Sequence, residues 1–284
     1  MAKLLSGKEV VLTLNESLIQ RAATLKGKGV VPCLAIVRVG ERGDDIAYEN
    51  GATKRCEKIG VAVKKFVLSE NARQDELLNV IEEINHDDSI HGCLLFRPLP
   101  TRFDDETVRN ALLPEKDVDG ITDGSLAGVF AGTKNGFPPC TPAACMEILD
   151  YFGIETKGKR ATIIGRSLVV GKPAAMMLTK KNATVTICHT KTVDMPSVCR
   201  QAEILIVAAG RAGIVDKEYF APGQVVIDVG INVDENGKLC GDANFDEAEP
   251  IVDAITPVPG GVGTVTTSVL VKHVIEAAER STLR

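Results

Sequence analysis

Strand-like and helix-like segments alternate along this chain from one end to the other. Apolar runs of strand length, such as residues 33–40 and 91–96, are separated by segments with helical periodicity, such as 45–59 and 72–85. Because a helix after each strand returns the chain to the start of the next, this order predicts parallel sheets built from β-α-β units. Further strands are expected at 61–68, 160–164, 183–188, 203–208 and 225–229, and further helices at 8–25 and 267–281.

The alternation is interrupted at residues 114–142, which are dense in Gly, Pro, Asp and Thr. This composition predicts loops and short turns around a cleft or hinge. A second α/β series follows, and DENGK at 234–238 predicts the tight turn of a small hairpin. We therefore expect two α/β domains. Residues 1–139 form the first, with the helix at about 267–284 packed back on it, and 140–266 form a Rossmann-like, doubly wound parallel sheet.

The composition limits the possible partners. The net charge of the 284 residues is -5 without a long basic run, which argues against nucleic acid. No apolar stretch approaches the ~18 residues of a membrane span, and the start lacks a signal-peptide core. The eight cysteines contain no CxxC pair and there are only four histidines, so we expect no metal site. Most cysteines are expected to be small buried hydrophobes in a reducing, cytoplasmic protein.

The segment IIGRSLVVGKP, residues 163–173, has the features of a phosphate-binding turn without the spacing G-x-G-x-x-G. It follows an expected strand, contains Gly165 and Gly171, and precedes a helix of about ten residues. Free amides and the helix dipole at such a position suit a pyrophosphate. Arg166 and Ser167 add a guanidinium and a hydroxyl group, both suited to phosphate. The alternative is an ordinary glycine-bounded turn.

The end of the next strand favours NADP over NAD. In a doubly wound fold this end lies beside the adenosine ribose, yet TICHTKT at 186–192 has no acidic residue to accept a 2'-hydroxyl. It carries three side chains with donors: His189, Thr190 and Lys191. Together with Arg166, these donors suit a 2'-phosphate. The segments 207–213 and 227–232 also run from an apolar strand into glycine, which permits close approach of a ligand at a shared crevice.

These segments together resemble one family. GRSLVVGKP, ATVTICHTKT, AEILIVAAGRAG, VVIDVGIN and ITPVPGGVGTVT, with VGERGDDIAYENGATKRCEKIG, PEKDVDG and PPCTP in the first half, look like the methylenetetrahydrofolate dehydrogenase/cyclohydrolase family of the FolD type. The resemblance covers essentially the whole chain. It implies a folate cleft between two α/β domains and a homodimer formed through the cofactor domain. Such enzymes oxidise 5,10-methylene-tetrahydrofolate to the methenyl form with NAD(P), and most then hydrolyse it to 10-formyl-tetrahydrofolate.

The resemblance also assigns roles to individual residues. The cofactor-binding positions are Gly165, Arg166 and Ser167 in the loop, Thr190 at the ribose or 2'-phosphate, and Ile231 as a backbone contact to nicotinamide. The catalytic and substrate-binding positions are Tyr48, which stacks on the substrate, and Asp119, which binds the pterin ring. The backbone around Gly260, Gly261 and Val262 lines the folate cleft. Without the family, Tyr48 reads as a packing residue and Asp119 as a turn cap.

The chain departs from the family at two positions. Family members with both activities carry a lysine four residues after the tyrosine, on the same helix face, but this chain has Ala52 there. Lys54 lies about 240° around the helix from Tyr48 and is expected to be solvated. The glutamine that assists the lysine is replaced by Phe96. Because the lysine and the glutamine are both replaced, neither is left in a buried site without its hydrogen-bond partner.

These two replacements affect the two reactions differently. Hydride transfer needs geometry and carboxylate charge near the cationic product, for which Asp119, Asp44, Asp45 and Glu49 are candidates. Hydrolysis needs general acid–base groups, which alanine and phenylalanine cannot supply. We therefore expect a dehydrogenase with weak or absent cyclohydrolase activity.

Two other readings remain open. One is a bifunctional enzyme that uses Lys54 or Arg97 as the base, and another is a folate-binding protein without turnover. A shikimate-type dehydrogenase shares a glycine-serine loop but not TPVPGGVG or PEKDVDG. NAD remains possible as the cofactor, since Arg166 can also serve the pyrophosphate.

Overall fold

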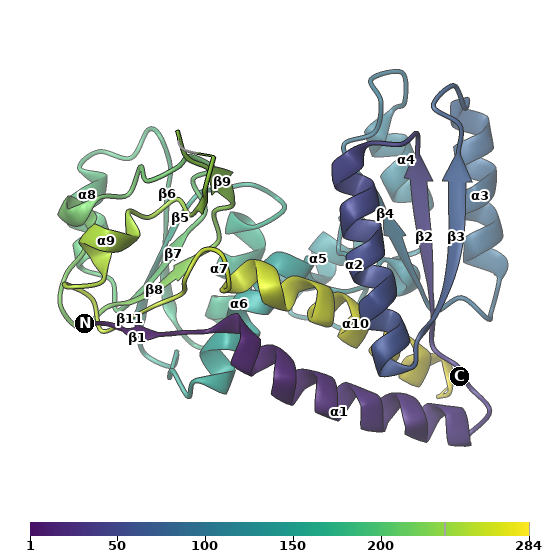
Figure 1. The fold of residues 1–284 in the computed structure, drawn as a ribbon, viewed down its shortest axis with the longest axis horizontal. Helices are drawn as coiled ribbons and strands as arrows, with labels where there is room; N and C mark the ends of the chain where they lie inside the picture. Colours follow the sequence, from purple (N-terminus) through teal and green to yellow (C-terminus); the bar gives the residue numbers. More distant parts are fainter. Residues whose placement is uncertain (236, 284) are drawn as a thin grey trace. The chain divides into compact units, whose positions relative to one another are not determined.

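The computed structural model describes residues 1–235 and 237–283, and this part of the chain divides into two compact units (Figure 1). Unit 1 consists of Met1–Leu12 and Thr141–Thr266. Unit 2 consists of Thr13–Cys140 and the residues from Thr267 onward. Neither unit is a continuous stretch of chain, because helices α1 (Gly7–Gly27) and α10 (Val262–Ser281) each begin in unit 1 and end in unit 2.

Unit 2 contains a parallel sheet with the order β3-β2-β4 within the described residues. The strands are β2 (Cys33–Val39), β3 (Ala62–Leu68) and β4 (Gly92–Leu95), and helices α2 (Gly43–Ile59), α3 (Gln74–His86) and α4 (Asp105–Ala111) connect and extend them. All seven residues of the central strand β2 are buried. Helix α3 buries Leu77, Ile81 and Ile84, which recur at helical spacing, against this sheet.

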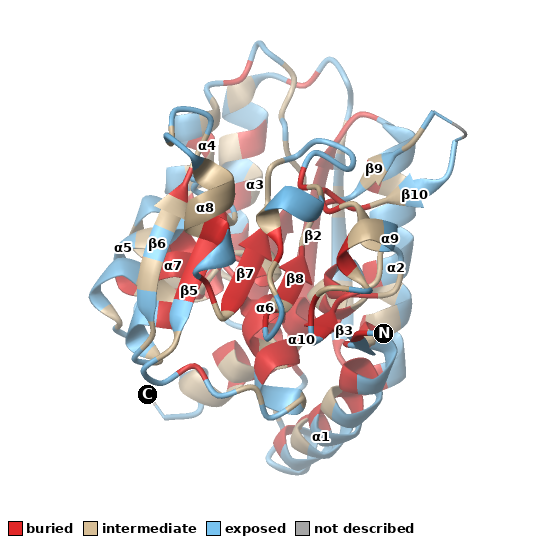
Figure 2. Ribbon diagram, turned by 90° about the vertical axis from the view of Figure 1, so that its left-hand side faces the viewer, coloured by how far each residue is buried: buried red, intermediate tan, exposed pale blue. Residues whose placement is uncertain are grey.

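Unit 1 contains a parallel sheet of six strands in the part of the chain that the structure describes, in the order β1-β11-β8-β7-β5-β6. The strands are β1 (Lys3–Leu4), β5 (Arg160–Ile164), β6 (Thr184–Cys188), β7 (Ile204–Val207), β8 (Val225–Asp228) and β11 (Ala254–Ile255). Figure 2 shows that β5, β7 and β8 form the buried centre of this sheet. Ile164 is in register with both Cys188 and Val207, so the carboxyl ends of neighbouring strands lie at one edge.

Shorter elements complete the two units. They are α5 (Asp123–Ala131), α6 (Cys140–Tyr151), α7 (Gly171–Lys180), α8 (Met195–Arg200), α9 (Phe245–Ala248), the 3-10 turns η1 (Pro114–Lys116) and η2 (Lys217–Tyr219), and the hairpin strands β9 (Asn232–Val233) and β10 (Leu239–Cys240). The predicted hairpin is therefore present, although Asn236 of its turn lies outside the described residues. No helix within the described ranges has the length and apolar character needed to span a membrane.

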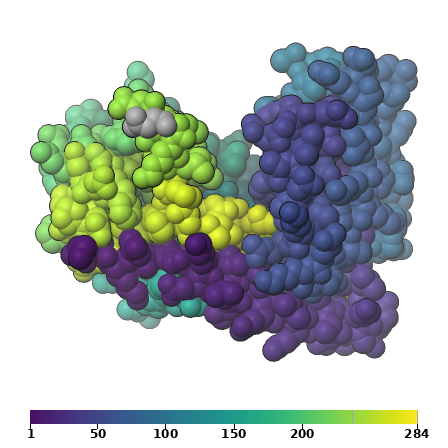
Figure 3. Space-filling view, in the orientation of Figure 1, coloured from purple at the N-terminus to yellow at the C-terminus, as the bar shows by residue number. Residues whose placement is uncertain are grey.

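The structure differs from the sequence-based expectations in two places. The segment 114–142 was expected to be loops and turns, but it contains helix α5, which Thr122 caps by accepting a hydrogen bond from the amide of Ser125. The first residues were expected in the same domain as residues up to 139, but β1 pairs with β11 of unit 1. Figure 3 shows this segment, in purple, lying along the carboxyl-terminal part of unit 1. Such a two-residue strand has no periodicity to detect.

Candidate functional site

The loop after β5 is shaped by two glycines that no other residue can replace without a backbone shift. Gly165 has a φ of 122°, and a Cβ at this position would lie 2.3 Å from the carbonyl oxygen of Ala208. A Cβ at Gly171 would lie 2.1 Å from the carbonyl oxygen of Gly165. The strand end and the first turn of α7 are therefore in direct backbone contact. This close turn before a ten-residue helix is the arrangement in which backbone amides can face a phosphate.

The polar groups predicted for the cofactor occupy two adjacent strand ends of unit 1. Arg166 and Ser167 are exposed in the loop, and the Ser167 hydroxyl accepts a hydrogen bond from the amide of Val170. Thr190 is exposed after the end of β6. The two ends are joined because the amide of Gly165 donates to the carbonyl of Cys188, at 2.9 Å. Unit 1 thus presents a guanidinium and two hydroxyl groups along one edge of its sheet.

The remaining predicted residues of unit 1 follow β8 and β11 at the same edge. Ile231 is exposed just after β8, and a Cβ added to Gly263 would lie 3.1 Å from its Cδ1 atom. Gly260 has a φ of 107°, and its carbonyl accepts a hydrogen bond from the amide of Gly7. Unit 1 therefore brings Ile231 close to the start of α10, where Gly260, Gly261 and Val262 lie.

The predicted substrate residue Tyr48 contacts Phe96, one of the two positions where the chain departs from the family, in unit 2. Their ring centroids are 5.9 Å apart and the planes are nearly perpendicular, at 84°. Ala52 follows Tyr48 by one helical turn and is fully buried. Residues at four successive turns of the same face, Asp45, Glu49, Ala52 and Cys56, are buried as well. The positions to which the family resemblance assigns a lysine and a glutamine are therefore occupied here by a buried methyl group and an aromatic ring.

Asp119 lies in an environment that disfavours its charge. Burial raises the pKa of Asp119 to about 6, in spite of a hydrogen bond from Cys140, and the charge of nearby Asp117 adds to the effect, whereas Arg97 opposes it. The Cys140 thiol also contacts the carbonyl oxygen of Val118, at 3.4 Å. At neutral pH this carboxyl is ionised but poorly solvated, which favours binding of a positively polarised group.

The other charged groups considered for this region are either ion-paired or exposed. Arg97 forms a bidentate ion pair with Asp105, which raises the pKa of the guanidinium, and Lys54 is exposed. Glu49 is paired with both Arg38, at 2.9 Å, and Lys65, at 2.8 Å. The expectation that Glu49 adds negative charge for a cationic product is therefore weakened, because two cations already compensate that carboxylate.

Two buried aspartates of unit 1 were missed by the sequence analysis. Asp228 and Asp242 are 3% and 0% exposed and hold the loops after β7 and β8. Burial raises the pKa of Asp228 to about 6, although three backbone amides favour its charged form. The sequence signal for them was an aspartate that ends an apolar strand, in IDVGIN, and another directly after the hairpin, in CGDAN.

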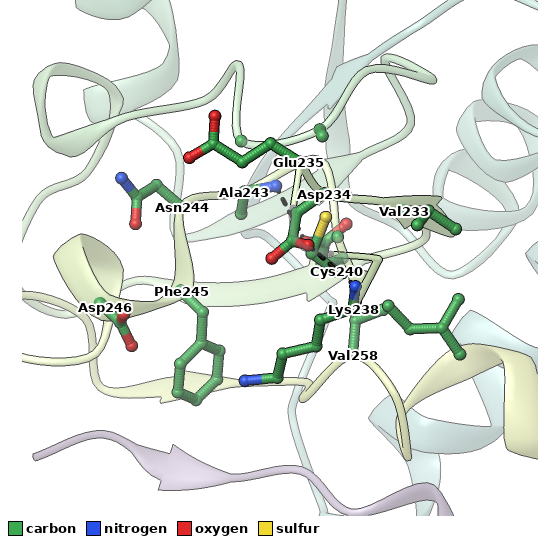
Figure 4. A pocket seen from close by; sticks show the side chains of 15 residues that line it. Val233, Asp234, Glu235, Lys238, Cys240, Ala243, Asn244, Phe245, Asp246 and Val258 are labelled. Atoms are coloured by element: carbon green, nitrogen blue, oxygen red, sulfur yellow. Dashed lines mark hydrogen bonds between the residues drawn. The ribbon is translucent and has the colours of Figure 1, made fainter.

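A cavity of about 590 Å³ lies between the region of these aspartates, the hairpin and α9 (Figure 4).

Comparisons with known proteins agree with this geometry. The model for the tetrahydrofolate dehydrogenase/cyclohydrolase catalytic domain matches residues 5–119, and the model for the NAD(P)-binding domain of the same family matches residues 139–282. A relative from Carboxydothermus hydrogenoformans, named bifunctional protein FolD, is 54% identical over 281 residues, which is 98% of each chain.

Solved structures give the same result. The bifunctional enzyme FolD of Campylobacter jejuni superposes with a TM-score of 0.96 at 39% identity, covering 99% of this chain and 100% of the other. The Trypanosoma brucei enzyme, solved with NADP and an inhibitor, gives a TM-score of 0.92 at 32% identity over 100% of this chain and 99% of its own. The chain therefore belongs to the tetrahydrofolate dehydrogenase/cyclohydrolase family.

Proposed function

We propose that this protein oxidises 5,10-methylene-tetrahydrofolate to 5,10-methenyl-tetrahydrofolate by transferring a hydride to NADP. The observation that carries the proposal is the intact glycine turn of Gly165 and Gly171 in a chain that matches both domain models of the family. We assign NADP to the edge of the unit 1 sheet, where Arg166, Ser167 and Thr190 supply donors for the phosphates. NADP in the Trypanosoma brucei structure supports this choice of cofactor.

The substrate is assigned to Tyr48 and Asp119 of unit 2. Tyr48 is 38% exposed, so one part of its ring is available for stacking on a pterin. The Asp119 carboxylate accepts hydrogen bonds from ring N–H groups, and its charge favours the cation that forms when hydride leaves the one-carbon unit. The C–H electron pair moves to the nicotinamide ring, and no proton is removed from the carbon. The residues therefore need to orient two reactants rather than provide a base.

We further propose that hydrolysis of the methenyl product is weak or absent. Attack of water on this cation requires a group that takes up a proton. Ala52 is fully buried and Phe96 presents a ring, so neither provides such a group. The ion pair of Arg97 with Asp105 and the exposure of Lys54 argue against either as a substitute base.

The second candidate function is a bifunctional dehydrogenase/cyclohydrolase, because the relatives at 54% and 39% identity are both named bifunctional. A third, a folate-binding protein without turnover, predicts a damaged cofactor loop, which is not what Gly165 and Gly171 form. We also expect a homodimer, as the family resemblance implies; sedimentation of the purified protein measures this directly.

Two assays on the same purified protein test the proposal. Formation of NADPH from methylene-tetrahydrofolate and NADP is expected. If no NADPH forms, the result favours a folate-binding protein without turnover. Loss of methenyl-tetrahydrofolate absorbance is expected to stay at the spontaneous rate. Rapid hydrolysis would establish the bifunctional enzyme. If the Lys54→Ala variant then loses hydrolysis but retains NADPH formation, Lys54 is the base. Parallel measurements with NAD determine the cofactor preference.

A further inference from the structure

Unit 1 contains two buried carboxylates that are bonded to backbone amides from three separate segments of the chain. Asp228 is the last residue of β8, and Asp242 follows β10. Buried acids are normally paired or fully hydrogen-bonded, because an unsatisfied carboxylate in the interior is costly. The partners of these two acids therefore show which segments they hold together.

Asp228 holds the backbone that carries Asp242. Its Oδ1 atom accepts from the amides of Gly230, at 2.9 Å, and Asp242, at 3.1 Å, and its Oδ2 atom accepts from the amide of Ala243, at 2.9 Å. A Cβ added to Gly241 would lie 1.9 Å from Oδ2, so this approach depends on a glycine. The carboxylate thus connects the end of β8 to the segment after the hairpin.

Asp242 in turn holds the loops that follow β7 and β8. Its Oδ2 atom accepts from the amide of Gly210, at 2.8 Å, and its Oδ1 atom accepts from the amide of Arg211, at 2.9 Å, and from the Asn232 side chain Nδ2, at 2.8 Å. A Cβ added to Gly230 would lie 2.4 Å from the Asp242 carboxyl carbon. The two loops are therefore tied to one buried group.

Ile231 lies between two of these attachment points. The amide of Gly230, before it, is bonded to Asp228, and the side chain of Asn232, after it, is bonded to Asp242. We propose that Asp242, held in place by Asp228, is a positioning residue that fixes the backbone of Ile231 against the nicotinamide ring. This inference rests on the proposed function, in which the Ile231 backbone contacts that ring.

The physical reason is the sensitivity of hydride transfer to distance and alignment. A misplacement of about 1 Å by a remote group can reduce turnover by about 100-fold. The adenosine and phosphate contacts of the cofactor lie at β5 and β6, on other strands of the sheet. Loosening the Ile231 backbone therefore changes the chemical step much more than the affinity for NADP.

The test compares two asparagines that are each half-buried and each make one side-chain hydrogen bond. Asn232→Ala removes the bond to Asp242. The matched control Asn244→Ala removes the cap of α9, where the Asn244 side chain accepts from the amide of Glu247, without touching either loop. Asp242→Asn is the stronger perturbation, because both carboxylate oxygens accept hydrogen bonds. In the variant one of them is replaced by an NH2 group, which cannot accept a hydrogen bond from the donor that it faces.

For Asn232→Ala we expect kcat for NADP reduction to fall by about 10-fold and for Asp242→Asn by about 100-fold, with the NADP dissociation constant changed by less than about threefold. The deuterium isotope effect with substrate labelled at the methylene carbon should rise in both, since hydride transfer becomes more limiting. Asn244→Ala should keep the kcat and isotope effect of the unsubstituted protein.

Two results would count against the proposal in different ways. If Asn232→Ala and Asp242→Asn retain kcat and isotope effect while losing only as much thermal stability as Asn244→Ala, the two aspartates are structural and the positioning role is overturned. If the unsubstituted protein binds NADP but does not reduce it, the proposed function fails, and the positioning role fails with it.

Discussion

Introducing lysine at position 52 and glutamine at position 96, singly and together, tests whether the missing polar pair is the reason that the methenyl cation is not hydrolysed. Ala52 is fully buried, so Ala52→Lys places an ammonium group in a packed site. Overpacking of this kind costs about 1–3 kcal/mol, and burial lowers the pKa of the new amine. Phe96→Gln removes a ring pair with Tyr48 that is worth about 0.5–1.5 kcal/mol. Each single variant should lose stability and gain little hydrolysis.

The double variant should behave differently because the glutamine carbonyl can accept a hydrogen bond from the ammonium group. Such a bond to a charged group contributes about 1.5–3 kcal/mol. Since about 1.4 kcal/mol corresponds to a factor of ten, the coupling is about 10- to 150-fold. The hydrolysis rate of Ala52→Lys/Phe96→Gln should exceed the rate expected from the two single variants by this factor.

The assay follows the decay of methenyl-tetrahydrofolate absorbance above the spontaneous rate. NADPH formation on the same preparations shows that the site remains intact, and urea unfolding measures the cost of each change. Lys54→Ala is the matched control for an amine on the same helix and should alter neither reaction. Equal hydrolysis by Ala52→Lys and by the double variant would refute the reasoning, since Phe96 then imposes no limit. So would strict additivity of the two changes.

Further predictions concern Asp119, the cofactor loop and the cofactor preference. Burial raises the pKa of Asp119 to about 6, so the tetrahydrofolate dissociation constant should rise as pH falls through about 6, and this dependence should be absent in Asp119→Asn. Because the folded pKa lies above the ordinary 3.8, the free energy of unfolding should also fall as pH rises from 3.8 to about 6, where Asp119 loses its proton more readily in the unfolded chain. Urea titrations at several pH values measure this. Gly165→Ala places a methyl group 2.3 Å from the Ala208 carbonyl oxygen at positive φ, so calorimetry should show NADP binding weakened by roughly tenfold or more; unchanged affinity would contradict the tight turn. Arg166→Ala should lower the ratio of kcat/KM for NADP to that for NAD by about tenfold, and an equal loss for both would place the guanidinium on the pyrophosphate.

The sequence was informative wherever burial and periodicity act together. The runs at 33–40 and 160–164 are buried strands, and the glycine-bounded loop after the second is where a phosphate turn was expected. The alternation therefore predicted the α/β class and the parallel sheets. That Ala52 and Phe96 share a site with Tyr48 was implied by the family resemblance and not by the alternation; in the structure the rings of Tyr48 and Phe96 are in contact.

Features that depend on contacts between distant segments were not predictable in this way. Helix α5 contains Gly124 and Gly128, which read as loop residues, yet a Cβ at Gly128 would lie 2.0 Å from the carbonyl oxygen of Asn135. Packing against a neighbouring segment thus overrides the low helix propensity of glycine. Asp242 was missed for a related reason, since the amides that it accepts from are 31 and 32 residues earlier in the chain.

The passage of α1 and α10 from one unit into the other has a consequence for synthesis of the protein. Strand β1 is separated from its partner β11, at Ala254–Ile255, by residues Thr13–Cys140 of unit 2 and by most of unit 1. The second unit likewise receives its final helix only from residue 267 onward. Unit 1 cannot complete its sheet before β11 is made, and unit 2 cannot be completed before the end of α10 is made, so the two units cannot finish folding one after the other in chain order.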